Sequence, residues 1–384
     1  MRRFTRSMPA MVWGHTNSHR ALSTTPCLSY KIVIPDYDPV GGQKGPEYKH
    51  LLGDPIIKNT VPAHAPYKKY CNFYGKMVML GFGSIGQGTL PLLLRHIGGL
   101  TPDRFRILTG DERGRDVAER YGVQFEVRPL TEENYRDILS PLLKEGDFLL
   151  NASVSVGSVD LIKWCQQHGV NYLDSDNVPW PGSEDDDIVG STNYGFRWEG
   201  LSATRTTRDP DPLEKRPTCV LTHGANPGLI SHFTKQALLN LAGSETPVPT
   251  SRVEWAKLAQ DLDVRVMHIA ERDTQVTKKR KQIGEFVNTW SIEGFTYELL
   301  QPSELGWGTH EKHFPKDGHR YDFGRKNSIY LSTPSINVKV RSWTPHSGVH
   351  QPYLVTHCES ITLSDYFTVW EGDEAVYRPT VHFA

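Results

Sequence analysis

The stretch VMLGFGSIGQGTLPLLLRH, residues 78–96, decides the fold. Its apolar start predicts a short buried strand from Lys76 to Leu80, and its second half predicts an apolar helix from Thr89 to His96. The glycines between them have the spacing G-x-G-x-x-G, which allows a tight turn, close approach of a pyrophosphate and close helix packing. A helix N-terminus after such a turn binds phosphate through its free N–H groups. We therefore expect a dinucleotide site formed by Gly81, Gly83, Ser84, Ile85 and Gly86.

Strands and helices continue to alternate beyond this stretch. The hydrophobic pattern predicts strands at 105–108, 124–128, 147–151 and 171–173, and helices at 115–121, 132–143 and 159–168. Such alternation is typical of a doubly wound parallel sheet with helices on both faces. The fold class is therefore expected to be α/β, with a Rossmann domain that spans residues 71–225.

Polar residues follow two of these strands at the edge where doubly wound sheets bind ligands. Asp111 follows the first, at the position where an acid bonds the adenosine ribose of NAD and repels the 2′-phosphate of NADP. Arg113 would favour NADP instead, and a solvated turn of mixed charge is a third interpretation. Asn151 and Ser153 lie at the end of the third predicted strand and are cofactor-site candidates by position.

Composition and charge exclude several classes of protein. The 384 residues are 38% hydrophobic, which is enough for ordinary globular cores. The formal net charge of -1 provides no field that would recruit nucleic acid or an anionic membrane. No apolar stretch approaches the roughly 20 residues that a membrane helix needs. We therefore expect no nucleic-acid partner and no membrane partner.

Cysteine and histidine spacings give no sign of a metal site or a disulfide framework. The five cysteines are scattered and odd in number, and none lies in a C-x-x-C pair. His310, His313 and His319 lie close together in the sequence, but their spacing does not match H-E-x-x-H. We expect no metal ion and a reducing compartment.

Residues 1–70 differ in composition from the rest of the chain and are expected to form a leader. The first part is rich in arginine, serine and threonine and has no acidic residue before Asp36, as in a mitochondrial transit peptide. A disordered tail or a misassigned start codon explains the same composition. The expected location is cytoplasmic, with the mitochondrion as the alternative.

Several separate blocks of the chain carry a resemblance to a known family. They include GFGSIGQGTLPLLLRH at 81–96, THGANPGLISHFTKQAL at 222–238, GEFVNTWSIEGF at 284–295 and THCESITLSDYFTV at 356–369. From about Gly75 onward, the chain resembles the homospermidine synthase family of the saccharopine dehydrogenase-like superfamily. The resemblance implies that a mixed α/β catalytic domain, expected at residues 226–384, follows the Rossmann domain.

The resemblance also implies a reaction. Members of this family hold NAD tightly and use it to oxidise putrescine to an imine. A second diamine attacks the imine, and the stored hydride reduces the product, so that no net redox change occurs. The implied partners are diamines such as putrescine and spermidine, together with a second copy of the chain in a homodimer.

Three residues match functional positions of this family. Trp290 matches an active-site tryptophan, whose face would stabilise a cation by about 2 kcal/mol when desolvated. Glu298 matches a carboxylate that binds the reacting amine, and Glu271 matches an acid that anchors the substrate. From the residues alone, Trp290 would be a core side chain and Glu271 would lie in a solvated turn after a strand at 264–269.

His357 and Glu359 are candidates for handling protons. They alternate with Cys358, and in a strand this spacing places both side chains on one face. A histidine beside a glutamate suits proton transfer near neutral pH, although a buried structural histidine is the commoner case.

Asn226 and Pro227 precede an apolar helix expected at 229–241. Asparagine is a favourable N-cap and proline suits the first helical position, so helix initiation explains both residues. The resemblance adds a location beside the nicotinamide, which makes them cofactor-site candidates.

The chain departs from the family at two acids. Ser155 stands where the family usually carries an aspartate, and Val178 stands where it carries a glutamate. Both acids belong to the family's diamine site, and each lost charge-assisted contact costs about 1.5–3 kcal/mol. Asp174 and Asp176 lie nearby in the sequence and are candidates to replace them. The acidic run at 183–187 is expected to be solvated and could draw polyamines toward the site.

The chain also ends at YRPTVHFA, where the family continues. We expect the catalytic domain to be incomplete there, with apolar surface left uncovered. Two alternatives to the synthase follow from these departures. One is a saccharopine- or carboxyspermidine-type NAD(P)H reductase, because a site with fewer acids suits an anionic substrate. The other is a catalytically inactive NAD-binding protein that acts through partners.

Overall fold

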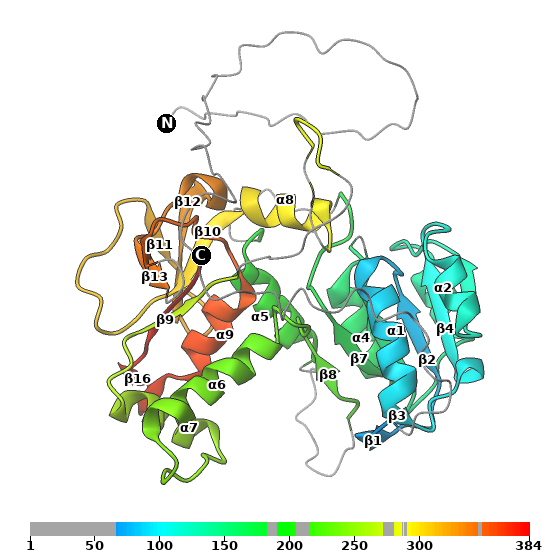
Figure 1. Ribbon diagram of the computed structural model, residues 1–384, viewed down its shortest axis with the longest axis horizontal. Coiled ribbons are helices and arrows are strands. Elements are labelled where there is room, and N and C mark those ends of the chain that lie inside the picture. The colour runs from blue at the N-terminus through cyan, green and yellow to red at the C-terminus, as the bar shows by residue number, and fades with distance from the viewer. Residues whose placement is uncertain are drawn as a thin grey trace. The chain divides into compact units, whose positions relative to one another are not determined.

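The computed structural model describes residues 67–154, 156–182, 190–204, 216–271, 280–285, 287, 290–344 and 348–384. The residues from Pro66 onward form one compact unit (Figure 1). The expected leader up to residue 66, Ser155 and the acidic run 183–187 lie outside the described residues. Within the described part of the chain, no helix is both long and apolar enough to cross a membrane.

The first sheet is parallel and has β2 (Met77–Leu80) in its middle. Its spatial order is β5 (Gln124–Val127), β4 (Phe105–Thr109), β2, β6 (Phe148–Asn151), β7 (Asn171–Asp174) and β8 (Cys219–Val220). The order reverses beside β2, which pairs with β4 on one side and with β6 on the other. Doubly wound folds bind ligands at such a reversal, and the glycine loop leaves β2 there. The expected Rossmann sheet is confirmed.

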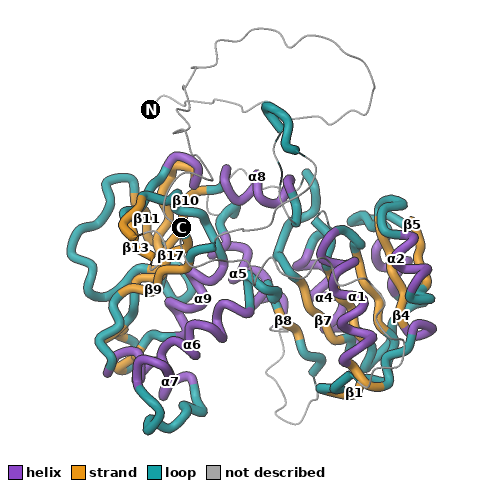
Figure 2. Tube along the Cα trace, in the orientation of Figure 1, coloured by secondary structure: helices purple, strands orange, loops and turns teal. Residues whose placement is uncertain are grey.

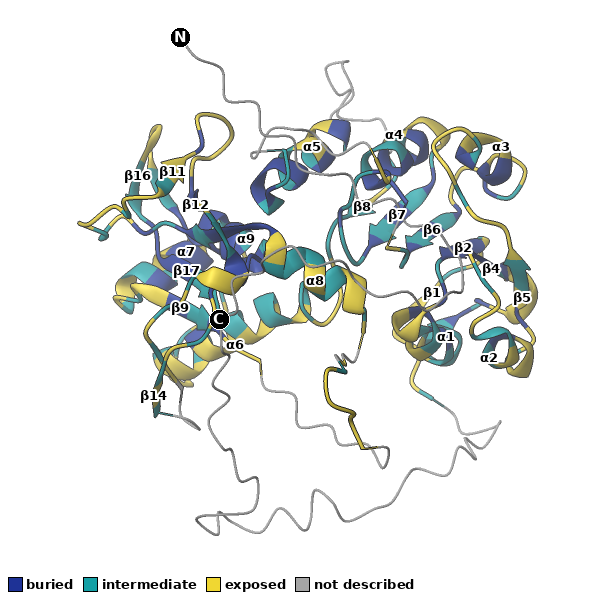
Figure 3. Cartoon of the chain, turned by 90° about the horizontal axis from the view of Figure 1, so that it is seen from above, coloured by how far each residue is buried: buried dark blue, intermediate teal, exposed yellow. Residues whose placement is uncertain are grey.

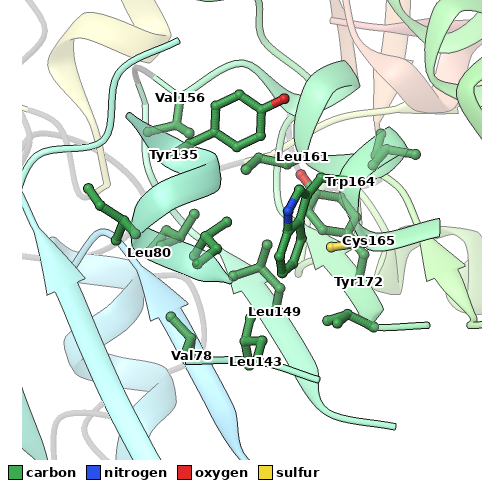
Figure 4. Close-up of a cluster of buried hydrophobic side chains, with 14 of the residues drawn as sticks. Val78, Leu80, Tyr135, Leu143, Leu149, Val156, Leu161, Trp164, Cys165 and Tyr172 are labelled. Atoms are coloured by element: carbon green, nitrogen blue, oxygen red, sulfur yellow. The ribbon is translucent and has the colours of Figure 1, made fainter. Parts of the chain in front are cut away.

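Helices cover both faces of this sheet. Figure 3 shows α1 (Ser84–His96) and α2 (Arg115–Arg120) on one side, and α3 (Tyr135–Leu139) and α4 (Ser158–His168) on the other. Strand β2 is buried on both faces, because Val78 and Leu80 join one core and Met77 and Met79 join the other. Figure 4 shows the first of these cores, where β2 meets Leu149 of β6 and Trp164 of α4.

Helix boundaries differ from the expected ones for local reasons. Helix α1 begins at Ser84 instead of Thr89, because the glycine loop continues directly into its first turn. Helix α3 begins later than expected, since the Asn134 side chain accepts a bond from the Thr131 N–H at 2.8 Å and closes a turn before it. Three short elements complete this domain: β1 (Cys71–Asn72), β3 (Ile97–Gly98) and the 3-10 helix η2 (Pro102–Arg104).

The second sheet is mixed, as expected for the second domain. Its order is β11 (Gly318–Arg320), β12 (Ser328–Pro334), β10 (Pro302–Gly306), β17 (Thr380–Phe383) and β9 (Val266–Ile269). Neighbours from β11 to β17 run antiparallel, whereas β17 and β9 run parallel. Helix α9 (Cys358–Tyr366) contacts β10 and β17, and Figure 2 shows it beside this sheet.

Further helices and two hairpins surround the second sheet. The helices are α5 (Asn193–Thr204), α6 (Leu229–Ala242), α7 (Arg252–Asp261), α8 (Ile292–Leu300) and the 3-10 helix η3 (Ser335–Asn337). The hairpins are β13 (Ser342–Thr344) with β14 (Gly348–His350), and β15 (Val369–Glu371) with β16 (Glu374–Tyr377). Helix α5 contacts both α4 of the first domain and α9, which packs on the second sheet, so it connects the two domains that carry the candidate site.

A buried carboxylate ties the second domain together. Glu304 of β10 is fully buried and accepts bonds from the backbone N–H groups of Asn193, at 2.7 Å, and Tyr194, at 3.1 Å. The hydroxyls of Tyr321 and Thr356 also donate to it, each at 2.7 Å. With all of these donors, the carboxylate is well satisfied despite its burial. It holds the start of α5 and the segment before α9 against β10.

Candidate active site

The glycine loop after β2 has the geometry of a dinucleotide-binding turn. Gly81 has a φ of +78°, and a Cβ atom there would lie 2.7 Å from the carbonyl oxygen of Ala152. A Cβ on Gly86 would lie 2.9 Å from the carbonyl oxygen of Gly81. Real Cβ atoms do not approach so closely, so both positions require glycine. The backbone of the turn therefore packs closely against the rest of the protein at Gly81 and Gly86.

Gly83 differs, because it faces open space. A Cβ atom there would meet nothing within 4 Å, although Gly83 directly precedes α1 as its N-cap. No side chain caps this helix end, so the first-turn N–H groups, including those of Ser84 and Ile85, have no side-chain acceptor at the cap. An open backbone at a helix N-terminus fits a pyrophosphate, and these residues would hold it.

A hydrogen-bonded chain supports the loop opposite Gly81. Asn151 Oδ1 accepts bonds from Ser153, at 3.2 Å from the backbone nitrogen and 2.5 Å from the hydroxyl. Asn151 Nδ2 donates to the Tyr172 hydroxyl at 3.2 Å, and this hydroxyl donates to Asp174 at 2.9 Å. Burial raises the pKa of Asp174 to about 7. Asn151 and Ser153 therefore brace the loop, and their contact with a cofactor stays a prediction.

Asp111 lies just beyond the carboxyl end of β4, where a ribose-binding acid belongs. Its carboxylate accepts bonds from Arg113, at 2.9 Å from the backbone nitrogen and 2.8 Å from Nε. The bonds from Arg113 lower the pKa of Asp111, so the acid is ionised at neutral pH. Asp111 and Arg113 lie in the same turn at the surface. Asp111 favours NAD and Arg113 favours NADP, so the preference for one cofactor depends on both side chains.

Most of the predicted catalytic side chains gather in a second group. The members that influence one another electrostatically are Asp176 after β7, Glu271 after β9, Glu298 on α8, and His357 and Glu359 at the start of α9. They come from segments far apart in the sequence, and the fold brings them together. Helices and loops of both domains thus contribute to one acidic site.

His357 and Glu359 form a buried pair, but not on a strand. Helix α9 begins at Cys358 with His357 as its N-cap, so the expected strand is wrong. An acid in a first helical turn is favoured by the helix dipole, and Glu359 occupies that position. His357 Nδ1 is hydrogen-bonded to Glu359, whose other oxygen accepts a bond from the Gly228 N–H at 2.8 Å. The His357 ring also stacks on Phe383, with 4.8 Å between centroids.

Asn226 and Pro227 lie beside this pair, but they do not start the helix as expected. Helix α6 begins at Leu229 and its N-cap is Gly228, whose φ of +120° strongly favours glycine. Asn226 instead donates from Nδ2 to Glu271 at 2.7 Å. The expected N-cap role is therefore wrong, and Asn226 orients an acid of the site.

Trp290 lies just before α8, and Glu298 lies on this helix. Trp290 is 38% exposed, and its indole covers Gly294, where a Cβ atom would lie 2.5 Å from the ring. Gly294 and Glu298 are four residues apart on α8 and so share a face. Gly294 was not among the expected site residues. Its position four residues after Trp290 and four before Glu298 would have indicated that it lies between them.

The charges of the neighbouring acids and of His357 shift the pKa values of His357 and Glu298. Burial raises the pKa of Glu298 to about 7, and the charges of Asp176, Glu271 and Glu359 act in the same direction against that of His357. Burial opposes protonation of His357, but its bond to Glu359 and the neighbouring carboxylates outweigh that effect and raise its pKa. Groups that titrate near neutral pH suit general acid–base catalysis.

Glu298→Gln should stabilise the protein at alkaline pH. The folded protein holds the Glu298 proton more tightly than the unfolded chain, so this residue favours folding below its ordinary pKa and the benefit is lost as the pH rises through about 7. Glutamine removes that loss, and we expect the free energy of unfolding at pH 8 to rise by about 2 kcal/mol. Urea unfolding at pH 5 and pH 8 measures this change in the free energy of unfolding. An equal change at both pH values would contradict the raised pKa of Glu298.

This fold and site define a dinucleotide-binding protein of the saccharopine dehydrogenase type. The model of the saccharopine dehydrogenase NADP binding domain matches residues 77–207, and that of the saccharopine dehydrogenase C-terminal domain matches residues 224–384. More particularly, the chain belongs to the homospermidine synthase family, as its resemblance to that family predicted.

Relatives from three bacteria support this assignment. Homospermidine synthase of Mesorhizobium japonicum is 44% identical over 334 residues, which are 84% of this chain and 67% of the relative. That of Blastochloris viridis is 44% identical over 325 residues, 82% of this chain and 67% of the relative. The structure of Legionella pneumophila homospermidine synthase in complex with NAD matches with a TM-score of 0.71 and 42% identity, over 83% of this chain and 66% of that one. The chain thus spans about two thirds of their length.

Proposed function

We propose that the chain forms polyamines by the chemistry of a homospermidine synthase, with NAD as cofactor and putrescine as donor. The observation that carries this proposal is the gathering of Asp176, Glu271, Glu359 and His357 around Glu298. A diamine is a dication at neutral pH, so its site needs carboxylates to hold it. The groups with the largest effect on Glu298, within the described part of the chain, are acids and one histidine, which disfavours an anionic reductase substrate.

Each side chain has a task in this reaction. Glu298, with a pKa of about 7, takes the proton that the reacting amine must lose. Trp290 offers an aromatic face to the positive charge that develops on the substrate. Glu271, oriented by Asn226, holds the distal ammonium, and the His357–Glu359 pair returns protons to the leaving amine. A bound nicotinamide would supply the hydride-transfer chemistry.

The remaining changes would take place on the substrate. The carbon beside the neutral amine would pass through an iminium ion, which the amine of a second diamine would attack. Ammonia would leave, and reduction of the new carbon–nitrogen double bond would give the balance of two putrescines to homospermidine and ammonia. Exclusion of water protects the imine between these steps, which explains why the reacting acids are partly buried.

A product assay tests the proposal. The purified chain is incubated with putrescine and substoichiometric NAD, and homospermidine and ammonia are measured by mass spectrometry and enzymatic detection. We expect product in excess of the NAD supplied and no accumulation of NADH. Stoichiometric NADH consumption with a carboxylated substrate would instead indicate a reductase. Tight NAD binding without turnover of any diamine would indicate an inactive binding protein.

A further inference from the structure

We propose that Asp176 is a diamine-binding carboxylate of this site, holding an ammonium group of the substrate beside Glu298. This inference rests on the proposed function and names the residue that compensates for the apolar Val178. The sequence offers Asp176 and Asp174 equally as replacements, and the fold is what brings Asp176 to the other acids.

The loop that carries Asp176 is firmly held at the carboxyl edge of the first sheet. The Ser158 hydroxyl donates to the backbone oxygen of Asp176 at 3.2 Å, and Ser158 and Val178 exchange bonds of 2.9 and 3.2 Å. Asn177 Nδ2 donates to the carbonyl oxygen of Phe196 on α5 at 2.7 Å. A loop fixed on both sides presents its side chains in a defined position, which a binding residue requires.

Among the residues that the structure describes, His357 is the cation that acts on Asp176. Asn177, the next residue, and Cys358, which follows His357, line the same small cavity, so the loop of Asp176 lies beside the start of α9. The charge of Asp176 acts on His357, Cys358 and Glu298. In the described part of the chain, no lysine or arginine forms an ion pair with it. Burial raises its pKa, and only His357 and the Asn177 backbone N–H oppose this rise.

Such a carboxylate is costly to the folded protein unless a ligand compensates for it. A partly buried acid with other acids nearby is destabilised in its ionised form, so a cation that enters the site is bound strongly. A flexible dication can meet two carboxylates at once, one at each end. Val178, two residues further on, offers only an apolar side chain, so Asp176 is the acid that this loop contributes.

Three variants test the inference on the NAD-loaded chain. Asp176→Asn removes the charge and keeps the shape, Asp176→Glu keeps the charge, and Asp116→Asn removes an exposed acid of α2 that pairs with Arg120. Putrescine binding is measured by calorimetry, and putrescine KM and kcat by the product assay. We expect Asp176→Asn to weaken binding about 10- to 100-fold, Asp176→Glu to recover much of it, and Asp116→Asn to match the wild type.

The thermal midpoint separates binding from a structural role. If Asp176 serves the substrate, Asp176→Asn leaves the midpoint unchanged or raises it, because a strained charge is removed. A lower midpoint with unchanged putrescine affinity would overturn the inference, as would equal losses in Asp176→Asn and Asp176→Glu. Homospermidine formation by the wild type would still support the proposed function in either case. Conversely, weaker binding in Asp176→Asn with no wild-type product would keep the inference and reject the function. A wild-type chain that binds no putrescine would overturn both.

Discussion

Glu359→Gln is expected to lower the rate of homospermidine formation by about 100-fold or more while NAD remains bound. Glu359 accepts bonds from His357 and from the Gly228 backbone at the same time. Glutamine can still accept from Gly228, but it no longer supports the imidazolium form of His357. Because the negative charge of Glu359 helps to raise the pKa of His357, its loss lowers that pKa. The limb of the pH–rate profile that reports His357 should therefore move to lower pH.

The same variant makes a prediction about stability. A histidine with a raised pKa stabilises the folded state below its ordinary pKa, and this benefit disappears as the pH rises through the folded value. The destabilisation by Glu359→Gln should accordingly be larger at pH 5.5 than at pH 9, as measured by urea unfolding. Glu374→Gln, at an exposed position of β16, is the control. If Glu359→Gln had the same pH–rate profile and the same rate of homospermidine formation as the wild type, the His357–Glu359 pair would not transfer protons in the reaction.

Gly83→Val is expected to weaken NAD binding by about 100-fold or more without unfolding the protein. The backbone of Gly83 has an ordinary φ of -73°, and its Cβ direction is free of neighbours within 4 Å. A valine side chain therefore fits the protein and occupies the space into which the pyrophosphate would fit. Fluorescence titration with NADH measures the affinity, and thermal unfolding measures the stability.

Gly88→Val is the matched control for this experiment. Gly88 lies on the same helix, and a Cβ atom there also meets nothing within 4 Å. It lies beyond the first turn, so its side chain should leave the dinucleotide unaffected. If both variants bound NADH as well as the wild type, the cofactor would not lie at the N-terminus of α1.

The first domain could be predicted well because its signals are local. The buried run in β2, the glycine spacing and the start of α1 lie within one short stretch, and the following alternation indicates a parallel sheet. Each strand buried on both faces needs apolar residues at successive positions, which a reader of the sequence can recognise. Boundaries were less predictable, since Asn134 shortens α3 through one side-chain bond.

The second domain could be predicted only in part, because its site depends on contacts between distant segments. The alternation of His357 and Glu359 fits a strand or a helix start, and only the packing of α9 on β10 and β17 decides between them. The helix begins at Leu229 as predicted, but Asn226, which fits an N-cap by type, does not cap it, because Gly228 with its positive φ is the N-cap. The importance of Asp176 depends on the position of α9, which no local pattern encodes.

The buried carboxylate of Glu304 determines how this site unfolds. Its bonds fix the first amides of α5 and the hydroxyl of Thr356, the residue directly before His357. Neither the start of α5 nor the segment that carries His357 can therefore fray by itself without removing hydrogen-bond donors from an acid buried inside the domain. The amides of Asn193 and Tyr194 should exchange with solvent only when the second sheet opens as a whole. His357 is thus tied to a cooperative unit and not to a mobile loop.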